Sequence, residues 1–162
     1  MMQISTKTEY GIRCLLRLAR LPDRQAGQPG QEAMSITDIA KLEHVPKHYA
    51  QQILMRLRRA GLVKSIRGTE GGFALAHPAE SISIAQVVRV LEGVPFQDTC
   101  DHFNKKTDCG HTGDCSIRPI WQVISSRLWD SLDRINLLHL INDERTVGRK
   151  LEVEIPVPRF QV

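Results

Sequence analysis

The chain has 162 residues, of which 41% are hydrophobic and 25% charged, so a packed core can form and wholesale disorder is excluded. Its charge is uneven: residues 1–80 hold 12 Lys and Arg against 7 Asp and Glu, whereas residues 81–162 hold 10 against 11. A basic half attracts polyanions such as nucleic acid, although a solvated basic surface has the same composition.

The chain shows no signal for export or membrane insertion. No apolar stretch approaches the roughly 20 residues that span a bilayer. Arg13, Arg17 and Arg20 interrupt the first apolar run. We therefore expect a protein without membrane contact, located in the cytoplasm. Disulfides are rare in that compartment, so the four cysteines indicate metal binding, redox chemistry or burial.

The first predicted helix covers residues 7–21, and Thr6 with Glu9 fits a capping box at its start. Residues 22–34 contain Gly, Pro and Gln without periodicity, so we expect an exposed loop there.

A helix-turn-helix is predicted next. Ser35 begins a second helix over residues 36–43, and Pro46 suits the first turn of a third. Gly61 is expected to close that third helix. Two helices separated by so short a break are typical of this motif.

Two short strands, residues 63–67 and 73–76, flank the Gly-rich segment 68–72 and predict a β-hairpin. A hairpin directly after a helix-turn-helix is the wing of a winged helix. A further helix is expected over residues 84–92, with a capping box formed by Ser83 and Gln86.

Apolar residues then recur three and four apart from Ile117 to Ile135, which predicts one long helix over residues 117–142. A stripe of this length favours a partner helix and hence a homodimer, with packing against the chain's own domain as the alternative. The expected fold class is mainly α with a small β-hairpin. It comprises a winged helix-turn-helix domain (1–93), a cysteine-rich loop (94–116), a dimerisation helix (117–145) and a tail (146–162).

The N-terminal residues of the second helix of a helix-turn-helix meet base edges in the major groove of DNA. Gln can bond adenine at two points, Lys can bond guanine or phosphate, and Arg can neutralise phosphates or enter a narrow minor groove. A helical hairpin with a solvated basic face is the alternative. The candidate DNA-binding residues are Lys47, His48, Tyr49, Gln51, Arg56 and Arg59 on the helix, and Arg67 and Gly68 at the wing tip.

Cys100, Cys109 and Cys115 follow a C-x8-C-x5-C pattern. Thiolates bind iron–sulfur clusters and other soft metals. Zinc would accept three Cys with a His such as His102 or His111, which gives the alternative of a zinc-stabilised winged-helix transcription factor. Redox-active or fortuitous thiols are a third interpretation. Of these, the spacing favours a cluster.

The fourth cysteine, Cys14, lies beside the apolar stripe of the first helix and is expected to be a buried small hydrophobe. Enzyme activity is not expected, because no nucleophile with a base and an orienting group is apparent. The glycines of residues 68–72 lack the Lys-Ser/Thr of a phosphate-binding loop.

Four segments together resemble the Rrf-two (Rrf2) family of winged-helix transcriptional regulators. They are MQISTKTEYGIRCLLRLA, SITDIAKLEHVPKHYAQQILMRLRRAGLV, the wing KSIRGTEGGFALA, and the three-cysteine loop before the long helix. The resemblance covers residues 2–142. It implies a homodimer with crossed long helices that binds a double-stranded DNA operator. It also implies one iron–sulfur cluster per subunit, 2Fe–2S in preference to 4Fe–4S. This cluster would sense redox state, nitric oxide or iron–sulfur status and so control a repressor or activator.

By the same resemblance, Cys100, Cys109 and Cys115 are cluster ligands. Some members have a His as the fourth ligand where this chain has Arg118. Others use an acidic residue at the start of the first helix, contributed by the partner subunit. Glu9 occupies that place and is the leading candidate for the fourth ligand, with the capping box as its alternative role.

Overall fold

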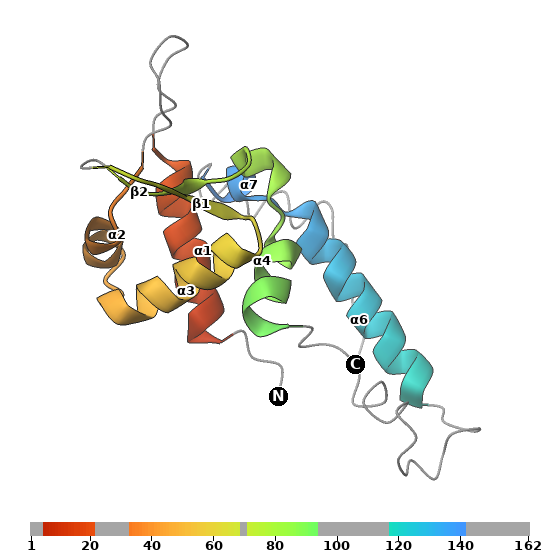
Figure 1. Cartoon of the computed structure of the whole chain (residues 1–162). Helices are drawn as coiled ribbons and strands as arrows, with labels where there is room; N and C mark the ends of the chain where they lie inside the picture. Colours follow the sequence, from red (N-terminus) through yellow and green to blue (C-terminus); the bar gives the residue numbers. More distant parts are fainter. Residues whose placement is uncertain (1–4, 22–32, 69–70, 94–116, 142–162) are drawn as a thin grey trace.

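The computed structural model describes residues 5–21, 33–68, 71–93 and 117–141. Figure 1 shows α3 crossing α1, the hairpin at one end of α1, and α4 between α3 and α6. The predicted winged-helix fold is confirmed. In chain order the elements are α1 (Thr6–Ala19), α2 (Ile36–Leu42), α3 (Lys47–Arg59), β1 (Val63–Ile66), β2 (Gly72–Leu75), the 3-10 turn η1 (Ala79–Ser81), α4 (Ile84–Glu92), α6 (Ile117–Arg134) and α7 (Leu137–Ile141).

The core is built around one face of α1. Leu15 and Cys14 are fully buried, and Leu18 is nearly so. They belong to one hydrophobic cluster with Ile53, Leu54 and Leu57 of α3, Val87, Val88 and Leu91 of α4, and Leu137 of α7. Full burial of one Leu or Ile side chain contributes about 1.5–3 kcal/mol. The prediction that Cys14 is a buried, small hydrophobic residue is confirmed by its full burial in this cluster.

The turn between α2 and α3 follows from local capping. The Ser35 hydroxyl accepts the Asp38 N–H at 3.2 Å, as the N-cap of α2. At the other end His44 adopts φ +53°, and the Val45 N–H reaches back to the Ala40 carbonyl at 2.9 Å. His is one of the few non-Gly residues that tolerates this left-handed conformation. The helix ends sharply, and the chain turns directly into α3.

The hairpin is antiparallel, with Val63 opposite Leu75. It also pairs with Met34, which exchanges two hydrogen bonds with Phe73, at 2.9 and 3.0 Å. Met34 was expected in an exposed loop, and that part of the prediction was wrong. A Cβ on Gly72 would lie 2.2 Å from the Met34 carbonyl oxygen, so only glycine allows this close approach.

The expected single long helix was also wrong, because α6 ends at Arg134 and α7 begins at Leu137. The Ile135 carbonyl accepts the Ile84 N–H at 2.8 Å, and the Leu137 N–H donates to the Ile82 carbonyl at 3.0 Å. These bonds pull the chain out of the helix at the break. The apolar periodicity continues across it because the residues on both sides face the same core.

The two ends of α6 have different surroundings. Near its C-terminal end, Trp129 packs on the core, and the Arg89 guanidinium lies 4.5 Å from its ring centre. Nearer its N-terminal end, Ile120 and Val123 are more than half exposed, and this part of α6 lies away from the other elements (Figure 1). No helix in the described ranges is long and apolar enough to cross a membrane.

The start of α1 differs from the predicted capping box. Ser5, not Thr6, is the N-cap, and its hydroxyl and that of Thr8 both donate to Oε1 of Glu92, the latter at 2.6 Å. Glu9 bonds Arg13 instead of the backbone. The capping-box role of Glu9 was therefore wrong, because a distant carboxylate at the end of α4 binds the hydroxyls at the start of α1.

The carboxylate of Glu92 is the acceptor that joins the end of α4 to the start of α1. Partial burial would raise its pKa, but the hydrogen bonds from Ser5 and Thr8 and the charge of Lys7, 3.8 Å away, together lower it below its ordinary value. The ionised carboxylate is thus the form that the fold stabilises.

A group with a lowered pKa stabilises the fold above its unfolded pKa, about 4.3 for Glu, and loses that contribution as the pH falls further. Glu92→Ala should lower the free energy of unfolding by about 1–3 kcal/mol at pH 7 because it removes charged hydrogen bonds. The gap between the variant and the unchanged chain should shrink as the pH falls below that value. Denaturant titrations between pH 7 and pH 3 measure it.

Glu80→Ala is the matched control, since Glu80 is an exposed carboxylate on η1. It should change stability by less than about 0.5 kcal/mol. A Glu92 effect that is equally large at pH 7 and pH 3 would contradict the anchoring role of its charge.

Candidate nucleic-acid interface

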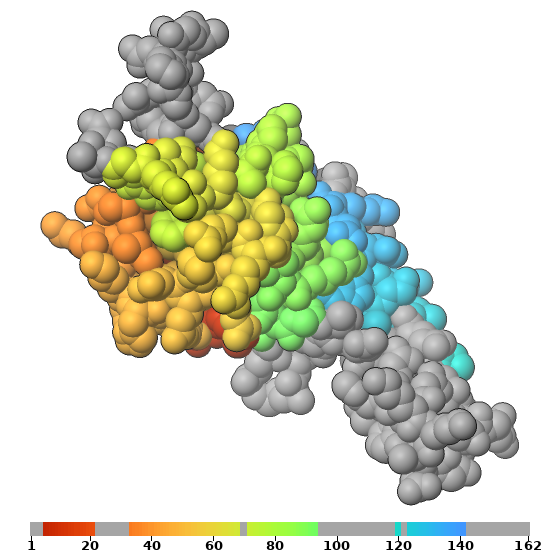
Figure 2. Space-filling model, viewed as in Figure 1, coloured from red at the N-terminus to blue at the C-terminus, as the bar shows by residue number. Residues whose placement is uncertain are grey.

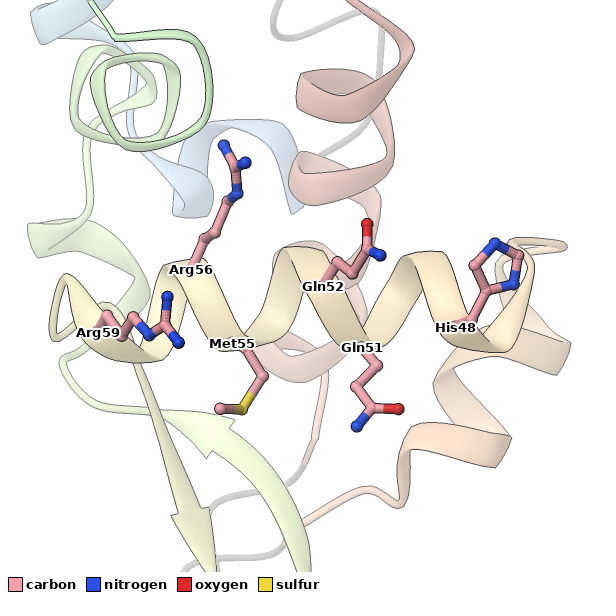
Figure 3. Close-up of a pocket in the computed structure, with 6 residues that line it drawn as sticks. All are labelled: His48, Gln51, Gln52, Met55, Arg56 and Arg59. Atoms are coloured by element: carbon pink, nitrogen blue, oxygen red, sulfur yellow. The ribbon is translucent and has the colours of Figure 1, made fainter.

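The outward surface of α3 forms an open groove (Figure 3). Five of the six lining side chains are polar or charged, and all come from this single helix. We call this surface the reading face. Its residues are His48, Gln51, Gln52, Met55, Arg56 and Arg59.

The opposite face of α3 explains why these side chains point outward. Ala50, Ile53, Leu54 and Leu57 are buried in the core, so helical periodicity sends the intervening positions into solvent. Figure 2 shows the surfaces of α2, α3 and the hairpin joined on one side of the molecule. The reading face is therefore continuous with the wing, as a groove-binding module requires.

Two contacts close to the turn between α2 and α3 hold the motif on α1. At the start of α3, the ring of Tyr49 meets that of Tyr10 on α1 edge to face, with 5.9 Å between ring centres. Beside it, Arg17 of α1 bonds Glu43, the residue that ends α2, at 2.5 Å. These contacts fix both helices of the motif on α1.

Positive charge gathers at the C-terminal end of α3, where Arg56, Arg58 and Arg59 are exposed. The Arg58 guanidinium donates to the Ser65 hydroxyl of β1 at 3.4 Å, which joins the helix to the wing. The other two line the reading face. Free guanidinium groups at this position can bind phosphates and release counterions.

At the wing, Arg67 and Gly68 are exposed after β1. Gly68 has φ +128°, a conformation that favours glycine, so the chain can turn tightly there. Arg67 thus stands exposed at the edge of the hairpin, directly after β1.

The structure sorts the sequence candidates into two groups. His48, Gln51, Arg56 and Arg59 share the reading face, and Lys47 is exposed at the start of the same helix. Tyr49 is different, because its ring is half-buried and packs against the core. It positions α3 and is not part of the reading face.

Sequence reasoning gave no role to Met55, which lines the centre of the reading face. The signal was available: position 55 follows His48 by seven residues and Gln51 by four, so all three lie on one side of a helix.

Cys100, Cys109 and Cys115, with His102 and His111, lie outside the described residues. In the part of the chain that the structure does describe, no three His, Cys, Asp or Glu side chains are placed to hold a metal ion.

Two further residues bear on a metal site. Burial, with the nearby charge of Glu43, raises the pKa of the Cys14 thiol to about 12, so this buried cysteine stays protonated at neutral pH. Glu9 is exposed on the first turn of α1, where Arg13 holds its carboxylate at 2.6 Å. Such a surface ion pair contributes little stability and leaves the carboxylate accessible.

Comparison with known proteins gives consistent results. The sequence model of the Rrf2 family, described as iron-dependent transcriptional regulators, matches residues 4–143. The HTH-type transcriptional regulator IscR of Cereibacter sphaeroides is 34% identical over 131 residues, which are 81% of this chain and 76% of that protein.

Two solved structures agree with the fold. CymR, the global cysteine regulator of B. subtilis, has a TM-score of 0.66 and 31% identity, with 87% of this chain and 97% of that chain covered. The structure of T. potens IscR has a TM-score of 0.62 and 26% identity, with 99% and 94% covered.

We expect the reading face and the wing to contribute separately to DNA binding. Gln51→Ala should weaken binding to a specific operator by about 1–3 kcal/mol and relax preference at one base pair, because a bidentate contact to a base is lost. Arg67→Ala should weaken binding most where the operator has a narrow A·T-rich minor groove. Fluorescence anisotropy with labelled duplexes at moderate salt measures both.

Arg134→Ala is the charge-matched control, since it removes an exposed Arg at the end of α6. Helix α6 lies on the far side of α4 from α3 (Figure 1). This variant should leave operator affinity unchanged. Unaltered binding in both Gln51→Ala and Arg67→Ala would contradict the docking of α3 and the wing on DNA.

Proposed function

Because the chain belongs to the Rrf2 family of iron-dependent transcriptional regulators, we propose that an iron–sulfur cluster in its cysteine segment controls operator binding by α3 and the wing. The coarser part of this function is established. The chain is a helix-turn-helix transcriptional regulator that binds DNA, and it is not an enzyme. The cluster, its type and its signal are the proposal.

The observation that carries the proposal is the division of the cysteines. Cys14 is sealed in the core with a raised pKa, which leaves Cys100, Cys109 and Cys115 as the available thiols. Three thiolates within 16 residues suit a cluster, which needs soft ligands. When bound, a cluster supplies a centre that changes with redox state or nitric oxide; the 2Fe–2S type is favoured over 4Fe–4S.

Glu9 is proposed as the fourth ligand, contributed to the cluster of the partner subunit. Its side chain is 55% exposed, and its one described ion pair, with Arg13, lies at the surface. Little free energy opposes its release from that pair. A carboxylate is also a harder and weaker partner for iron than a thiolate, so this bond would be the labile one.

A line of contacts leads from Glu9 to the reading face. Arg13, which binds Glu9, stands over the Tyr10 ring at 5.9 Å, and Tyr10 packs edge to face on Tyr49. Tyr49 lies in the first turn of α3, beside His48. We propose that moving the Glu9 carboxylate shifts Arg13 and the two rings, and so changes how α3 presents its side chains.

A homodimer fits the same proposal. Ile120, Val123 and Ile124 of α6 are 58%, 54% and 43% exposed. Such neighbouring apolar side chains on one helix favour burial against a second helix. A second copy of α6 would bury them, and the proposed ligation by Glu9 of the partner subunit needs such a dimer.

The second candidate is a zinc-stabilised regulator without a cluster, in which His102 or His111 would complete the site. It keeps the same DNA-binding surface and loses only the redox response. The colour of the purified protein separates the two, since zinc is colourless.

The cysteine assignment is tested by replacing each thiol in turn. Cys100→Ala, Cys109→Ala and Cys115→Ala should each abolish or severely reduce the visible absorption, iron and sulfide of anaerobically purified protein, because each removes a ligand. Cys14→Ala is the control and should leave all three readings unchanged, since that thiol is buried. Full absorption in all three loop variants would refute the cluster, and bound zinc without iron would favour the second candidate.

The Glu9 assignment needs a different variant. Glu9→Ala should retain a cluster through the three cysteines but alter its absorption or reduction potential and its effect on operator affinity. Arg13→Ala removes the partner of Glu9 and keeps the carboxylate, so its spectrum should match that of the unchanged chain. If the spectrum and potential of Glu9→Ala are normal, Glu9 is no ligand, and His102 or His111 becomes the next candidate.

A further inference from the structure

The reading face has one apolar member. Met55 lies between Gln51 and Gln52 on one side and Arg59 on the other, spaced as successive turns of α3. Figure 3 shows the side chains of Met55 and Gln51 leaving the helix toward the same side. Met55 is thus an apolar side chain at the centre of a surface that is otherwise polar and basic.

Core packing does not explain this apolar side chain. Met55 is half-buried, and it is not among the partly buried hydrophobic residues that pack against either core cluster. Its neighbours Ile53 and Leu54 fill that role and are 1% and 0% exposed. Met55 is thus apolar where nothing in the described fold requires it.

The major groove contains one apolar group, the C5-methyl of thymine. We propose that Met55 is a specificity-determining residue that packs against this methyl group in the operator. The proposal rests on the DNA-binding role of α3. A flexible, polarisable thioether adapts well to such a contact. The other lining residues carry amide, imidazole and guanidinium groups, which suit hydrogen-bond acceptors, donors and phosphates.

Gln51 adds a geometric constraint. It lies one helical turn before Met55, and a Gln can bond adenine at N6 and N7. Because both side chains leave α3 on the same side, the thymine that Met55 contacts should lie in the base pair that Gln51 reads or in the next one. Each half-site should therefore contain either one A·T base pair that both side chains contact or two A·T base pairs next to each other.

Deoxyuridine tests this contact, because it lacks only the methyl group and keeps the hydrogen-bonding pattern of thymine. The full chain is used to select sites from a random duplex library. Each thymine of the selected site is then replaced singly by deoxyuridine. One replacement per half-site should weaken binding about fourfold, the effect expected for one buried methyl-sized group.

Met55→Ala should bind thymine and deoxyuridine duplexes equally at that position, whereas Met55→Leu should keep most of the difference. Gln51→Ala is the matched control on the same face. It should lose adenine preference and still respond to the missing methyl. Equal thermal stability of the variants verifies that each one is folded.

Three outcomes would overturn the inference. An enriched site at which no deoxyuridine replacement weakens binding would refute the Met55 contact alone. A Met55→Ala variant that responds to deoxyuridine as the unchanged chain does would refute it as well. A chain that enriches no sequence at all would overturn base reading by α3, and the Met55 contact with it.

Discussion

The burial of one face of α1 is the interaction on which the rest of the structure depends. Cys14 and Leu15 are fully buried there, and α3, α4 and α7 all share the cluster that they begin. Because α3 turns its apolar side to this cluster, its polar side faces outward as the reading face. Because α1 also carries Glu9 on its exposed side, the DNA-binding helix and the proposed cluster ligand are attached to the same element.

Glu92 and Arg17 complete this attachment with charge. Glu92 binds the hydroxyls at the start of α1 to the end of α4, one residue before the segment that leads to the cysteines. Arg17 ties α1 to the end of α2. The polar contacts of Glu92 and Arg17 therefore lie near the ends of the helices, whereas apolar packing stabilises the central turns. A displacement of α1 would thus reach the helix-turn-helix through packed helices and an ion pair, a kind of network that can carry coupling between two sites.

The features that the sequence predicted well are those with local causes. Ser35 caps α2 through the Asp38 N–H, and Ser83 and Gln86 form the predicted capping box. Gly61 takes φ +76° directly after Ala60, the C-cap of α3, as the sequence predicted for the end of that helix. The failures have distant causes. The break between α6 and α7 depends on hydrogen bonds to residues 82–84, and the start of α1 depends on Glu92, more than eighty residues away. The apolar periodicity of α1 and of α6 contains no information about such distant partners.

The candidate DNA-binding residues show the same distinction. The motif predicted His48, Gln51, Arg56 and Arg59 as DNA contacts, which stays a prediction, and the structure places all four on the reading face. The motif could not separate Tyr49, whose ring contacts Tyr10 on another helix. Nor could it reveal that Met55 is absent from the side chains that pack on the core within the described residues. Both facts depend on which side of α3 the rest of the chain covers, and only the folded arrangement contains that information.

The central claim is that a cluster on the cysteine segment sets the DNA affinity of α3 and the wing. The most direct measurement is operator affinity of one anaerobic preparation, with absorption recorded on the same sample, before and after the cluster is removed by nitric oxide or a chelator. The account predicts that affinity changes in step with loss of visible absorption, and that the Cys14→Ala protein behaves identically. Operator affinity that stays constant while the absorption disappears would contradict it.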